Sequence, residues 1–226
     1  MRFFNKFGVT QSYFGNDRQL LLNCIPLTDK QSLAALGKNW DPGFSGINLS
    51  NYAQNWKETK IMKILVLSDS HAALSFMRRC VQSVKPDAIV HLGDYFDDAL
   101  VLKEEFSDIP LYQVPGNCDR FRCRPGQPEI LIEKIGGISL YLTHGHRHNV
   151  KTYLGALLKD ARACKVDIAL YGHTHCPDCH QEEDGLWVLN PGSSGYFGGS
   201  AGLIEVAQGS IADCRLLQEK DLPDIW

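Results

Sequence analysis

An α+β fold with an α/β-like first half is predicted by the order in which patterns occur along the sequence. From Met62 to about Val114, short apolar runs alternate with stretches whose apolar residues recur three and four apart, which is typical of strands alternating with helices. After residue 186, short apolar runs separated by glycine-rich turns indicate antiparallel strands. Residue types that bind metals also follow several predicted strands, and the carboxyl ends of parallel strands share one edge where ligands gather.

Each predicted element is bounded by its own signals. Apolar residues spaced three and four apart, from Leu74 to Val84, indicate a helix with one buried face, which ends before Pro86. Two apolar runs on either side of Gly136-Gly137 predict a hairpin. The predicted strands are Lys63–Ser68, Ala88–Leu92, Leu111–Val114, Ile130–Ile135, Ile138–Leu142, Ile168–Tyr171, Leu186–Leu189, Gly202–Val206 and Ile211–Leu217; further helices are predicted at Asp97–Phe106 and Val150–Cys164, and a loop at 120–129.

The composition excludes several classes of protein. The chain has 226 residues, enough for one domain with a substantial core and an appendage. Its net charge of -3 does not support broad nucleic-acid or membrane binding, and no apolar run approaches the roughly 20 residues that span a bilayer. The N-terminus lacks the apolar core of a signal peptide, and the eight cysteines lack the spacing of a disulfide framework. We therefore expect a cytoplasmic protein with reduced thiols.

Residues 1–61 differ from the rest of the chain. They contain no histidine and have seven basic against four acidic residues, whereas the remainder has 16 basic and 22 acidic residues. We expect an N-terminal extension that is weakly structured or not translated, followed by one domain over 62–226. The second alternative arises because Lys57-Glu58 can be encoded by a bacterial ribosome-binding sequence shortly before Met62. If the intact mass of the native protein corresponds to a chain that starts at Met1, that alternative is excluded.

The histidines point to a metal site. All eight lie between His71 and His180, and several stand near carboxylate or amide side chains. Mixed oxygen and nitrogen ligation suits Mn²⁺, Fe²⁺ or Zn²⁺ better than Mg²⁺ or Ca²⁺. Seven ligands are too many for one tetrahedral zinc ion, but they suit two ions that share a carboxylate and hold a hydroxide between them. The candidate ligands are Asp69, His71, Asp94, Asn117, His144, His173 and His175.

Five short motifs contain these residues in a fixed order. In that order they resemble the motifs of the calcineurin-like metallophosphoesterases, over about residues 62–217. Each motif alone is weak, whereas all five together are specific. The sequence is most similar to the small bacterial and archaeal phosphodiesterase branch, which also shows Gly-Asn-Cys-Asp and Asn-Pro-Gly-Ser. The motifs are Asp69-x-His71, Gly93-Asp94, Gly116-Asn117-x-Asp119, His144-Gly145-His146 and Gly172-His173-x-His175, and the last tetrapeptide is Asn190-Pro191-Gly192-Ser193.

This resemblance implies both the fold and the ligand set. The implied fold is a four-layer αββα sandwich of two mixed β-sheets flanked by helices. The implied cofactors are two divalent ions, with Mn²⁺ preferred and Fe, Zn or Ni as alternatives. Carried over position by position, Asp69, His71 and His175 hold one ion, Asn117, His144 and His173 hold the other, and Asp94 bridges them.

Three further residues receive catalytic roles from the resemblance. His146 is expected to contact the phosphate rather than a metal, and Asp119 to orient its neighbours. Cys118 stands where many members have a histidine that assists the leaving group. A thiol with an ordinary pKa of about 8.5 is a different proton donor from imidazole. Esters with good leaving groups are therefore the expected substrates, unless His146 or another group substitutes.

Other cysteines, histidines and arginines near the motifs have simpler interpretations. Cys176-x-x-Cys179 has the spacing of zinc ligands, but a structural zinc site needs a second pair of ligands. We expect these two thiols to face solvent beyond the metal-binding turn. We expect His91 to pack or hydrogen-bond structurally, His148 to lie at the surface, and Arg120, Arg122 and Arg124 either to contact an anionic substrate or to form a solvated loop.

The sequence therefore predicts a dinuclear-metal-dependent phosphodiesterase that hydrolyses a small phosphate ester with a metal-bridging hydroxide. The alternative is a non-catalytic metal-binding scaffold of the same fold, as in a retromer subunit of eukaryotes, whose ligand positions have decayed. Here every ligand position is present. The excess of acidic residues after residue 61 argues against a nuclease. No membrane or stable nucleic-acid partner is expected, and a homo-oligomer is left open.

Overall fold

The computed structural model describes residues 61–222, with the exception of residues 122, 124, 125 and 197. It also describes two short strands nearer the N-terminus, β1 (Phe3–Phe4) and β2 (Thr10–Gln11). The chain divides into two units, residues 1–57 and 58–226. Most of the predicted extension, and Arg122 and Arg124 of the predicted arginine cluster, lie outside the described residues. The fold described below is that of the second unit.

The first β-sheet has five strands in the order β12-β11-β3-β4-β5. The strands β3, β4 and β5, the first three of this sheet along the chain, run parallel to one another, as in βαβ units. β11 pairs antiparallel with both β3 and β12. Residues 64–67 of the central strand are fully buried, which explains why that segment is a continuous apolar run. The strands are β3 (Met62–Leu67), β4 (Ala88–His91), β5 (Leu111–Gln113), β11 (Ser200–Ala207) and β12 (Ser210–Gln218).

The second β-sheet also has five strands, in the order β6-β7-β8-β10-β9. Its three central strands run parallel, and the strand at each edge pairs antiparallel with its neighbour. Both sheets are therefore mixed. The strands are β6 (Ile130–Ile135), β7 (Ile138–Thr143), β8 (Ile168–Leu170), β9 (Asp178–Gln181) and β10 (Trp187–Asn190).

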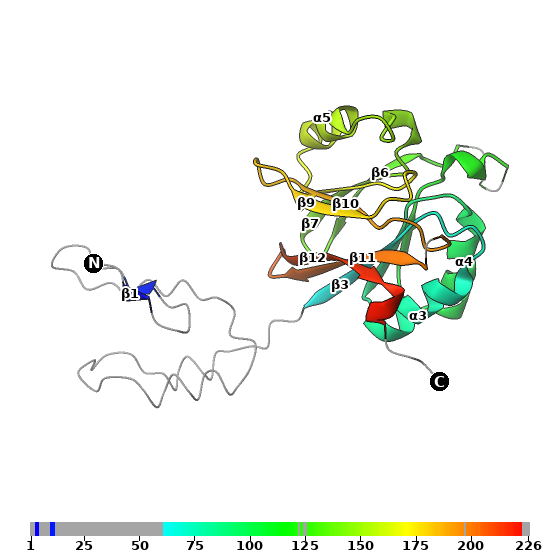
Figure 1. Ribbon diagram of the computed structural model, residues 1–226, viewed down its shortest axis with the longest axis horizontal. Coiled ribbons are helices and arrows are strands. Elements are labelled where there is room, and N and C mark those ends of the chain that lie inside the picture. The colour runs from blue at the N-terminus through cyan, green and yellow to red at the C-terminus, as the bar shows by residue number, and fades with distance from the viewer. Residues whose placement is uncertain are drawn as a thin grey trace. The chain divides into compact units, whose positions relative to one another are not determined.

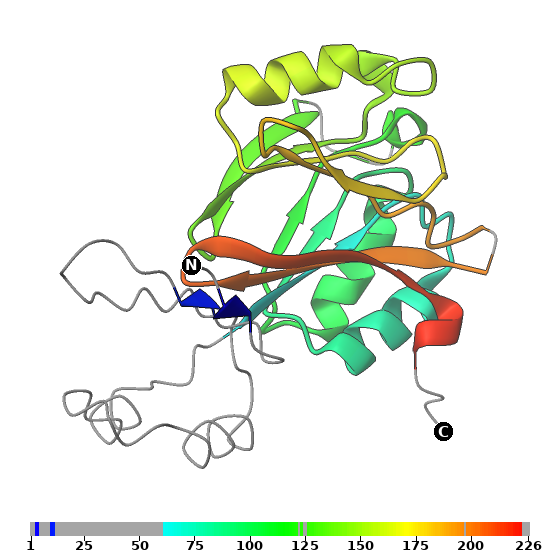
Figure 2. The ribbon, with the colours of Figure 1, turned by 60° about the vertical axis from the view of Figure 1, so that its left-hand side comes forward.

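Helices cover the outer face of each sheet (Figures 1 and 2). Two of them, α3 (Leu74–Val84) and α4 (Phe96–Glu105), pack on the first sheet, and α5 (Gly155–Ala163) packs on the second. The layers are thus helix, sheet, sheet and helix, which confirms the predicted four-layer sandwich. Three short 3₁₀ helices complete the described elements: η1 (Asn117–Asp119), η2 (His146–His148) and η3 (Glu219–Asp221).

Alternate residues of the strands build the apolar layers. Ile64 and Val66 of β3 face the second sheet, where they share a buried cluster with Leu140 and Leu142 of β7. The intervening residues of β3 face α3 instead. A third cluster lies between the second sheet and α5. This period of two is the expected consequence of a pleated strand that is buried on both faces.

The fold differs from the sequence analysis at four places, with three wrong predictions and one strand that was missed. The helix predicted from Val150 begins only at Gly155, because the chain first forms η2 and then turns through Asn149, which has a left-handed φ of 52°. The edge strand β9 was not predicted, since its sequence, Asp-Cys-His-Gln, shows no apolar alternation. β10 runs parallel to β8 and is antiparallel only to β9. His148 is buried rather than at the surface, and its Nε2 lies 3.2 Å from the hydroxyl of Tyr141.

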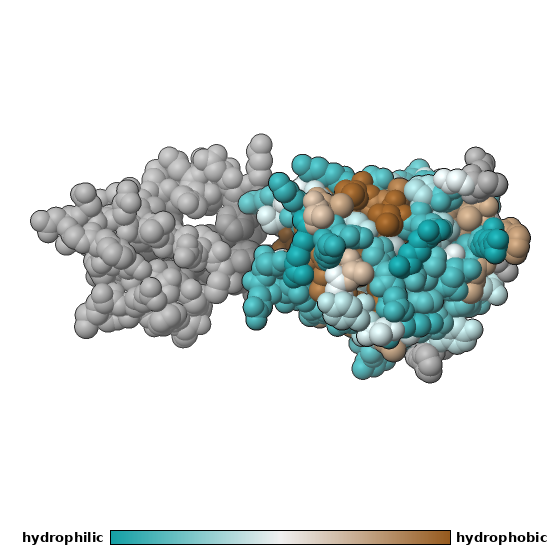
Figure 3. All heavy atoms as spheres, turned by 90° about the horizontal axis from the view of Figure 1, so that it is seen from above, coloured by the Kyte–Doolittle hydropathy of each residue, from teal (hydrophilic) through white to brown (hydrophobic). Residues whose placement is uncertain are grey.

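The surface over the α5 layer is mainly hydrophilic, with hydrophobic residues gathered on part of it (Figure 3). Among the described residues, no helix is both long and apolar enough to cross a membrane.

Candidate metal centre

The seven candidate ligands lie just beyond the carboxyl ends of parallel strands from both sheets. The first sheet supplies four of them and the second sheet supplies three, so the structure brings together residues more than one hundred positions apart. Asp69 and His71 follow β3, Asp94 follows β4, Asn117 follows β5, His144 follows β7, and His173 and His175 follow β8.

Five of these seven residues have a left-handed backbone. Such conformations cost roughly 1–3 kcal/mol each in residues other than glycine, and they persist where the surrounding structure fixes them, often at functional sites. Here each one turns the chain sharply as it leaves a strand. The φ values are 51° for Asp69, 45° for His71, 56° for Asp94, 69° for His173 and 59° for His175.

One ligand group surrounds Asp69. One donor atom from each of Asp69, His71, Asp94 and His175 lies within 4.8 Å of the other three. Asp69 is fully buried, and its Oδ1 lies 3.0 Å from His175 Nε2. Within the described part of the chain, neither Asp69 Oδ1 nor the buried His71 Nε2 has a hydrogen-bond partner. Buried polar atoms without partners need an explanation, and a divalent cation supplies one for this donor set.

A second ligand group lies on the other side of Asp94. His144 Nε2 is 3.1 Å from Asn117 Oδ1 and 3.6 Å from Asp94 Oδ1, and the ring of His173 is 5.0 Å from the ring of His144. His144 Nδ1 lies 2.7 Å from the carbonyl oxygen of Leu92. Since a carbonyl can only accept, Nδ1 carries the proton and Nε2 presents its lone pair to this group. The arrangement suits a second ion, with Asp94 between the two groups.

His146 lies next to this second group. Its ring is 5.4 Å from that of His144 and 6.1 Å from that of His173. Its Nε2 is 3.8 Å from Glu129 Oε2, and its buried Nδ1 has no hydrogen-bond partner among the described residues. Burial and the neighbouring His144 lower the pKa of His146, so the ring is neutral at pH 7.

The ionisation states in the site suit metal binding, which requires neutral imidazoles and ionised carboxylates. Burial, followed by the nearby His144, lowers the pKa of His173 to about 4. Burial acts to raise the pKa of Asp94, but His144 and the backbone N–H of Cys118 outweigh it, and the pKa falls below its ordinary value. At neutral pH, His173 is therefore neutral and Asp94 is ionised, which are the forms that bind a metal ion.

Hydrogen bonds hold Asp69 in one orientation. The hydroxyl of Ser68 donates to Asp69 Oδ2 at 2.5 Å, and the backbone N–H of His173 donates to the same oxygen at 3.1 Å. Both donors use Oδ2, which leaves Oδ1 directed at His175 and the first ligand group. A Cβ atom at Gly172 would lie 2.1 Å from Ser68 Oγ and 2.8 Å from Asp69 Oδ2, so only glycine allows this approach.

Asp119 does not face either ligand group. Its Oδ1 accepts the backbone N–H groups of Tyr95 (2.8 Å) and Phe96 (2.9 Å), and its Oδ2 accepts that of Gly116 (2.8 Å). The carboxylate therefore joins the loop after β5 to the first turn of α4. It thus holds together the loops that carry Asp94 and Asn117.

Cys118 is exposed and lies beside Asp94. Its backbone N–H donates to Asp94 Oδ1 at 2.9 Å. Partial burial and the negative charge of Asp94 raise the pKa of the Cys118 thiol to about 11. The thiol is therefore protonated at neutral pH, and a protonated thiol is a much weaker nucleophile than a thiolate.

Sequence reasoning missed two features of the site. Tyr196 stacks on His175, with ring centroids 5.3 Å apart and planes 15° apart, and it lies 4.9 Å from the ring of His71. No periodicity or motif marked this residue. The Asn190-Pro191-Gly192-Ser193 motif was noted without a role: Asn190 donates to Thr174 Oγ1 (2.8 Å), and Ser193 donates to the carbonyl oxygen of Asp69 (2.7 Å), so it ties two ligand loops together.

Comparisons with known proteins agree with this geometry. Residues 62–208 match the calcineurin-like phosphoesterase superfamily domain. A probable metallophosphoesterase of Mycoplasma pneumoniae is 32% identical over 134 residues, which cover 58% of this chain and 78% of the relative. A protein of Methanocaldococcus jannaschii named as a phosphodiesterase is 26% identical over 153 residues, covering 61% of this chain and 88% of that protein.

Solved structures show the same fold. A predicted phosphoesterase of Streptococcus pneumoniae superposes with a TM-score of 0.57 at 27% identity, over 71% of this chain and 91% of that one. The vacuolar protein sorting 29 protein of Cryptosporidium parvum superposes with a TM-score of 0.56 over 70% of this chain and 98% of that one. At 19% identity the second similarity concerns the fold alone.

Proposed function

Since this chain belongs to the calcineurin-like phosphoesterase superfamily, we propose that it is a dinuclear-metal-dependent phosphodiesterase acting on a small phosphate ester. The observation that carries the proposal is the position of Asp94, buried between two ligand groups. A shared carboxylate of this kind is what a pair of ions about 3.5–4 Å apart needs. The name of the archaeal relative supports a diester rather than a monoester as the substrate.

The two ligand groups divide the work. Asp69, His71 and His175 would hold one ion, and Asn117, His144 and His173 would hold the other. These mixed oxygen and nitrogen donors suit Mn²⁺, Fe²⁺ or Zn²⁺, and Mn²⁺ is the metal we propose. When bound, two such ions supply a nucleophile at neutral pH and a Lewis acid for the phosphate.

The chain's own groups then orient and stabilise the substrate. Asp94 lies beside His144, whose ring is held by the carbonyl oxygen of Leu92, and these contacts fix the position of one ligand group relative to the other. The neutral ring of His146, next to His144 and His173, would donate an N–H to a phosphate oxygen. The protonated thiol of Cys118 is a weak acid, which favours substrates whose alcohol leaves without help.

The experiment begins with protein stripped of metal by a chelator and resupplied with Mn²⁺. Turnover of bis(p-nitrophenyl) phosphate and p-nitrophenyl phosphate is measured while bound metal is counted. We expect two ions per chain and faster turnover of the diester. Two bound ions without turnover of either ester would contradict the enzyme proposal and favour a metal-binding scaffold.

Asp94→Asn tests the bridge. We expect at least a hundredfold loss of metal-dependent turnover and fewer than two bound ions, because a neutral amide is a weaker bridging ligand. Asp108→Asn is the matched control, since Asp108 is an exposed acid outside the site. Unchanged turnover in Asp94→Asn would refute the assigned bridge.

We also propose that catalysis resides in residues 62–226 and takes place in the cytoplasm. The seven cysteines among the described residues are all free, which supports a reducing location. A chain starting at Met62 is expected to match the full chain in kcat/KM, and the intact mass of the native protein would show whether residues 1–61 are present.

A further inference from the structure

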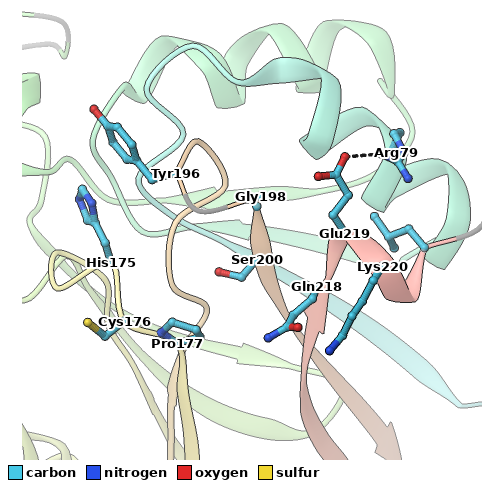
Figure 4. Close-up of a pocket in the computed structure, with 12 residues that line it drawn as sticks. Arg79, His175, Cys176, Pro177, Tyr196, Gly198, Ser200, Gln218, Glu219 and Lys220 are labelled. Atoms are coloured by element: carbon cyan, nitrogen blue, oxygen red, sulfur yellow. Dashed lines mark hydrogen bonds and ion pairs between the residues drawn. The ribbon is translucent and has the colours of Figure 1, made fainter.

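A groove opens directly beside the metal centre. It has a volume of about 950 Å³, and His175, a candidate ligand, lines it (Figure 4). Its walls come from the turn after His175, the loop around Gly198, the end of β12 with η3, and Arg79 of α3. Tyr196, stacked on His175, stands at the boundary between the groove and the ligands.

The groove is much larger than a phosphate group. Sites that enclose whole small organic ligands have volumes of about 300–1,000 Å³. A diester whose phosphorus lies at the metal centre therefore has room here for one of its two organic groups. Two polar side chains, Ser200 and Gln218, lie along the groove between the cations and His175 (Figure 4).

The charges of the groove are unequal. Arg79 Nη1 lies 2.6 Å from Glu219 Oε1, so these two charges largely compensate each other. Lys220 also lines the groove, is exposed, and takes part in no ion pair among the described residues. The surplus charge of the groove is therefore positive, although residues 62–226 as a whole have more acidic than basic residues.

We infer that the groove binds the organic group of a phosphodiester that carries a second anionic group, with Lys220 as the residue that selects it. The inference rests on the proposed function and adds the substrate class. A carboxylate or a phosphate would accept a charge-assisted hydrogen bond from the ammonium group of Lys220, whereas Arg79 is already paired with Glu219.

Two matched substrates test this inference. They are the p-nitrophenyl ester of thymidine 5′-phosphate and the same ester with an added 3′-phosphate. With the Mn²⁺-loaded full chain, we expect kcat/KM to be about tenfold higher for the ester that carries the 3′-phosphate, mainly through a lower KM, and we expect this preference to shrink at high salt. Lys220→Met should abolish the preference. Lys134→Met, an exposed lysine of β6 in the other sheet, should retain it.

Equal kcat/KM for both esters in the unmodified protein, or a preference that survives Lys220→Met, would overturn the inference. Failure to hydrolyse either ester would instead count against the proposed function. In that case equilibrium binding of thymidine 3′,5′-bisphosphate and thymidine 5′-phosphate to the Mn²⁺-loaded protein still decides the matter, because only the groove distinguishes them.

A separate observation concerns two thiols at the edges of the two sheets. Cys179 Sγ of β9 lies 3.5 Å from Cys214 Sγ of β12, and 3.3 Å from the carbonyl oxygen of Cys214. The sequence analysis predicted that Cys179 faces solvent, and this prediction is wrong. Its side chain is part of the contact between the two sheets. The contact with Cys214 lowers the pKa of Cys179 and raises that of Cys214.

We propose that peroxide converts this pair into a disulfide that joins the two sheets. The Cys179 thiolate attacks hydrogen peroxide, breaks the O–O bond and becomes a sulfenic acid with release of water. The Cys214 sulfur then forms the S–S bond and a second water leaves, so two thiols and one peroxide give one disulfide and two waters. The sulfur atoms need to move closer by about 1.5 Å to reach bonding distance.

The test treats the full chain with hydrogen peroxide and maps its peptides by mass spectrometry. We expect loss of two hydrogens, a Cys179–Cys214 cross-linked peptide, and a higher Tm that dithiothreitol reverses. Cys214→Ser and Cys179→Ser should each lose the Tm increase, while Cys176→Ser, at an exposed thiol nearby, should keep it. A disulfide between other cysteines, or Cys179 oxidised without a cross-link, would refute the proposal.

Discussion

The two oxygens of Asp119 accept three backbone N–H groups, from Tyr95, Phe96 and Gly116. The side chain is fully buried, so these bonds replace the water that a carboxylate otherwise requires. They also fix the two loops that carry Asp94 and Asn117. Asp119 thus contributes to the site through the positions of other residues.

Asp119→Asn should therefore lower both stability and activity. The amide nitrogen cannot accept an N–H, so at least one buried donor loses its partner, which costs about 1–3 kcal/mol. Urea denaturation measures the loss, and metal counting should show the first ligand group still occupied. Asp108→Asn controls for removal of one negative charge. A variant with unchanged stability would show that these hydrogen bonds contribute little.

Cys118 offers a prediction about leaving groups. Its pKa of about 11 makes the thiol a poor acid at neutral pH. Cys118→His should raise kcat for alkyl phosphodiesters by about 10- to 100-fold, near the lower range of general acid catalysis, and change kcat for p-nitrophenyl esters little. Cys118→Ala is the control and should leave both unchanged. Equal effects of the histidine and alanine variants would exclude proton donation at this position.

Residue types could be predicted here where chemistry selects them. Seven side chains with ligand atoms were predicted from their identity and their positions after strands, and the structure gathers them. Ser68 and Tyr196 could not be predicted. Ser68 acts through its hydrogen bond to Asp69 and Tyr196 through its stacking on His175, and only the folded loops create these contacts. The left-handed backbone of five candidate ligand residues could not be predicted either. Glycine is the usual sequence signal for that conformation, and none of these residues is glycine.

Among the elements, β4 carries a buried histidine that is not a candidate ligand. His91 is fully buried and accepts the backbone N–H of Gly93 through Nδ1 at 3.3 Å. Burial lowers its pKa to about 4, against about 6.5 in the unfolded chain. Between these values the unfolded state binds a proton that the folded state does not. Stability attributable to His91 is therefore complete above pH 6.5 and falls as the pH drops towards 4.

His91→Asn should remove this dependence. Asparagine retains an acceptor near the Nδ1 position but does not titrate. Between pH 7 and pH 5 the unmodified protein should lose about 2 kcal/mol more free energy of unfolding than the variant. Both proteins are measured by urea denaturation with a chelator present, so that the metal-binding histidines contribute equally. Parallel pH profiles would show that His91 does not titrate differently in the two states.

Elements with strong apolar patterns could be predicted, and those without them could not. The buried run of β3 and the spacing within α3 led directly to the observed elements. β9 is polar and lies at a sheet edge, where pairing with β10 alone defines it. The start of α5 depends on the left-handed turn at Asn149, which an apolar spacing pattern does not report.

At the scale of the whole molecule, the candidate metal centre lies where the two sheets meet, at one end of the apolar layer between them. Each proposed ion would bind ligands from both sheets: Asp69 with His175 in one group, and Asn117 with His144 in the other. Without metal, the buried Asp69 Oδ1 and His71 Nε2 lack hydrogen bonds among the described residues. The centre should therefore stabilise the contact between the sheets at this end of the sandwich.

Chelation tests this directly. An ion present at 100 times its Kd stabilises the folded state by about 2.7 kcal/mol, which corresponds to a Tm change of about 5–10 °C for a domain of this size. We expect that decrease on removal of Mn²⁺, its reversal on resupply, and a smaller change in Asp94→Asn. Hydrogen exchange should increase around Asp69 and His173 but not at the hairpin turn of Gly136 and Gly137, where β6 and β7 meet at the opposite end. An unchanged Tm, or exchange that increases equally at both ends, would show that the metals do not hold the sheets together.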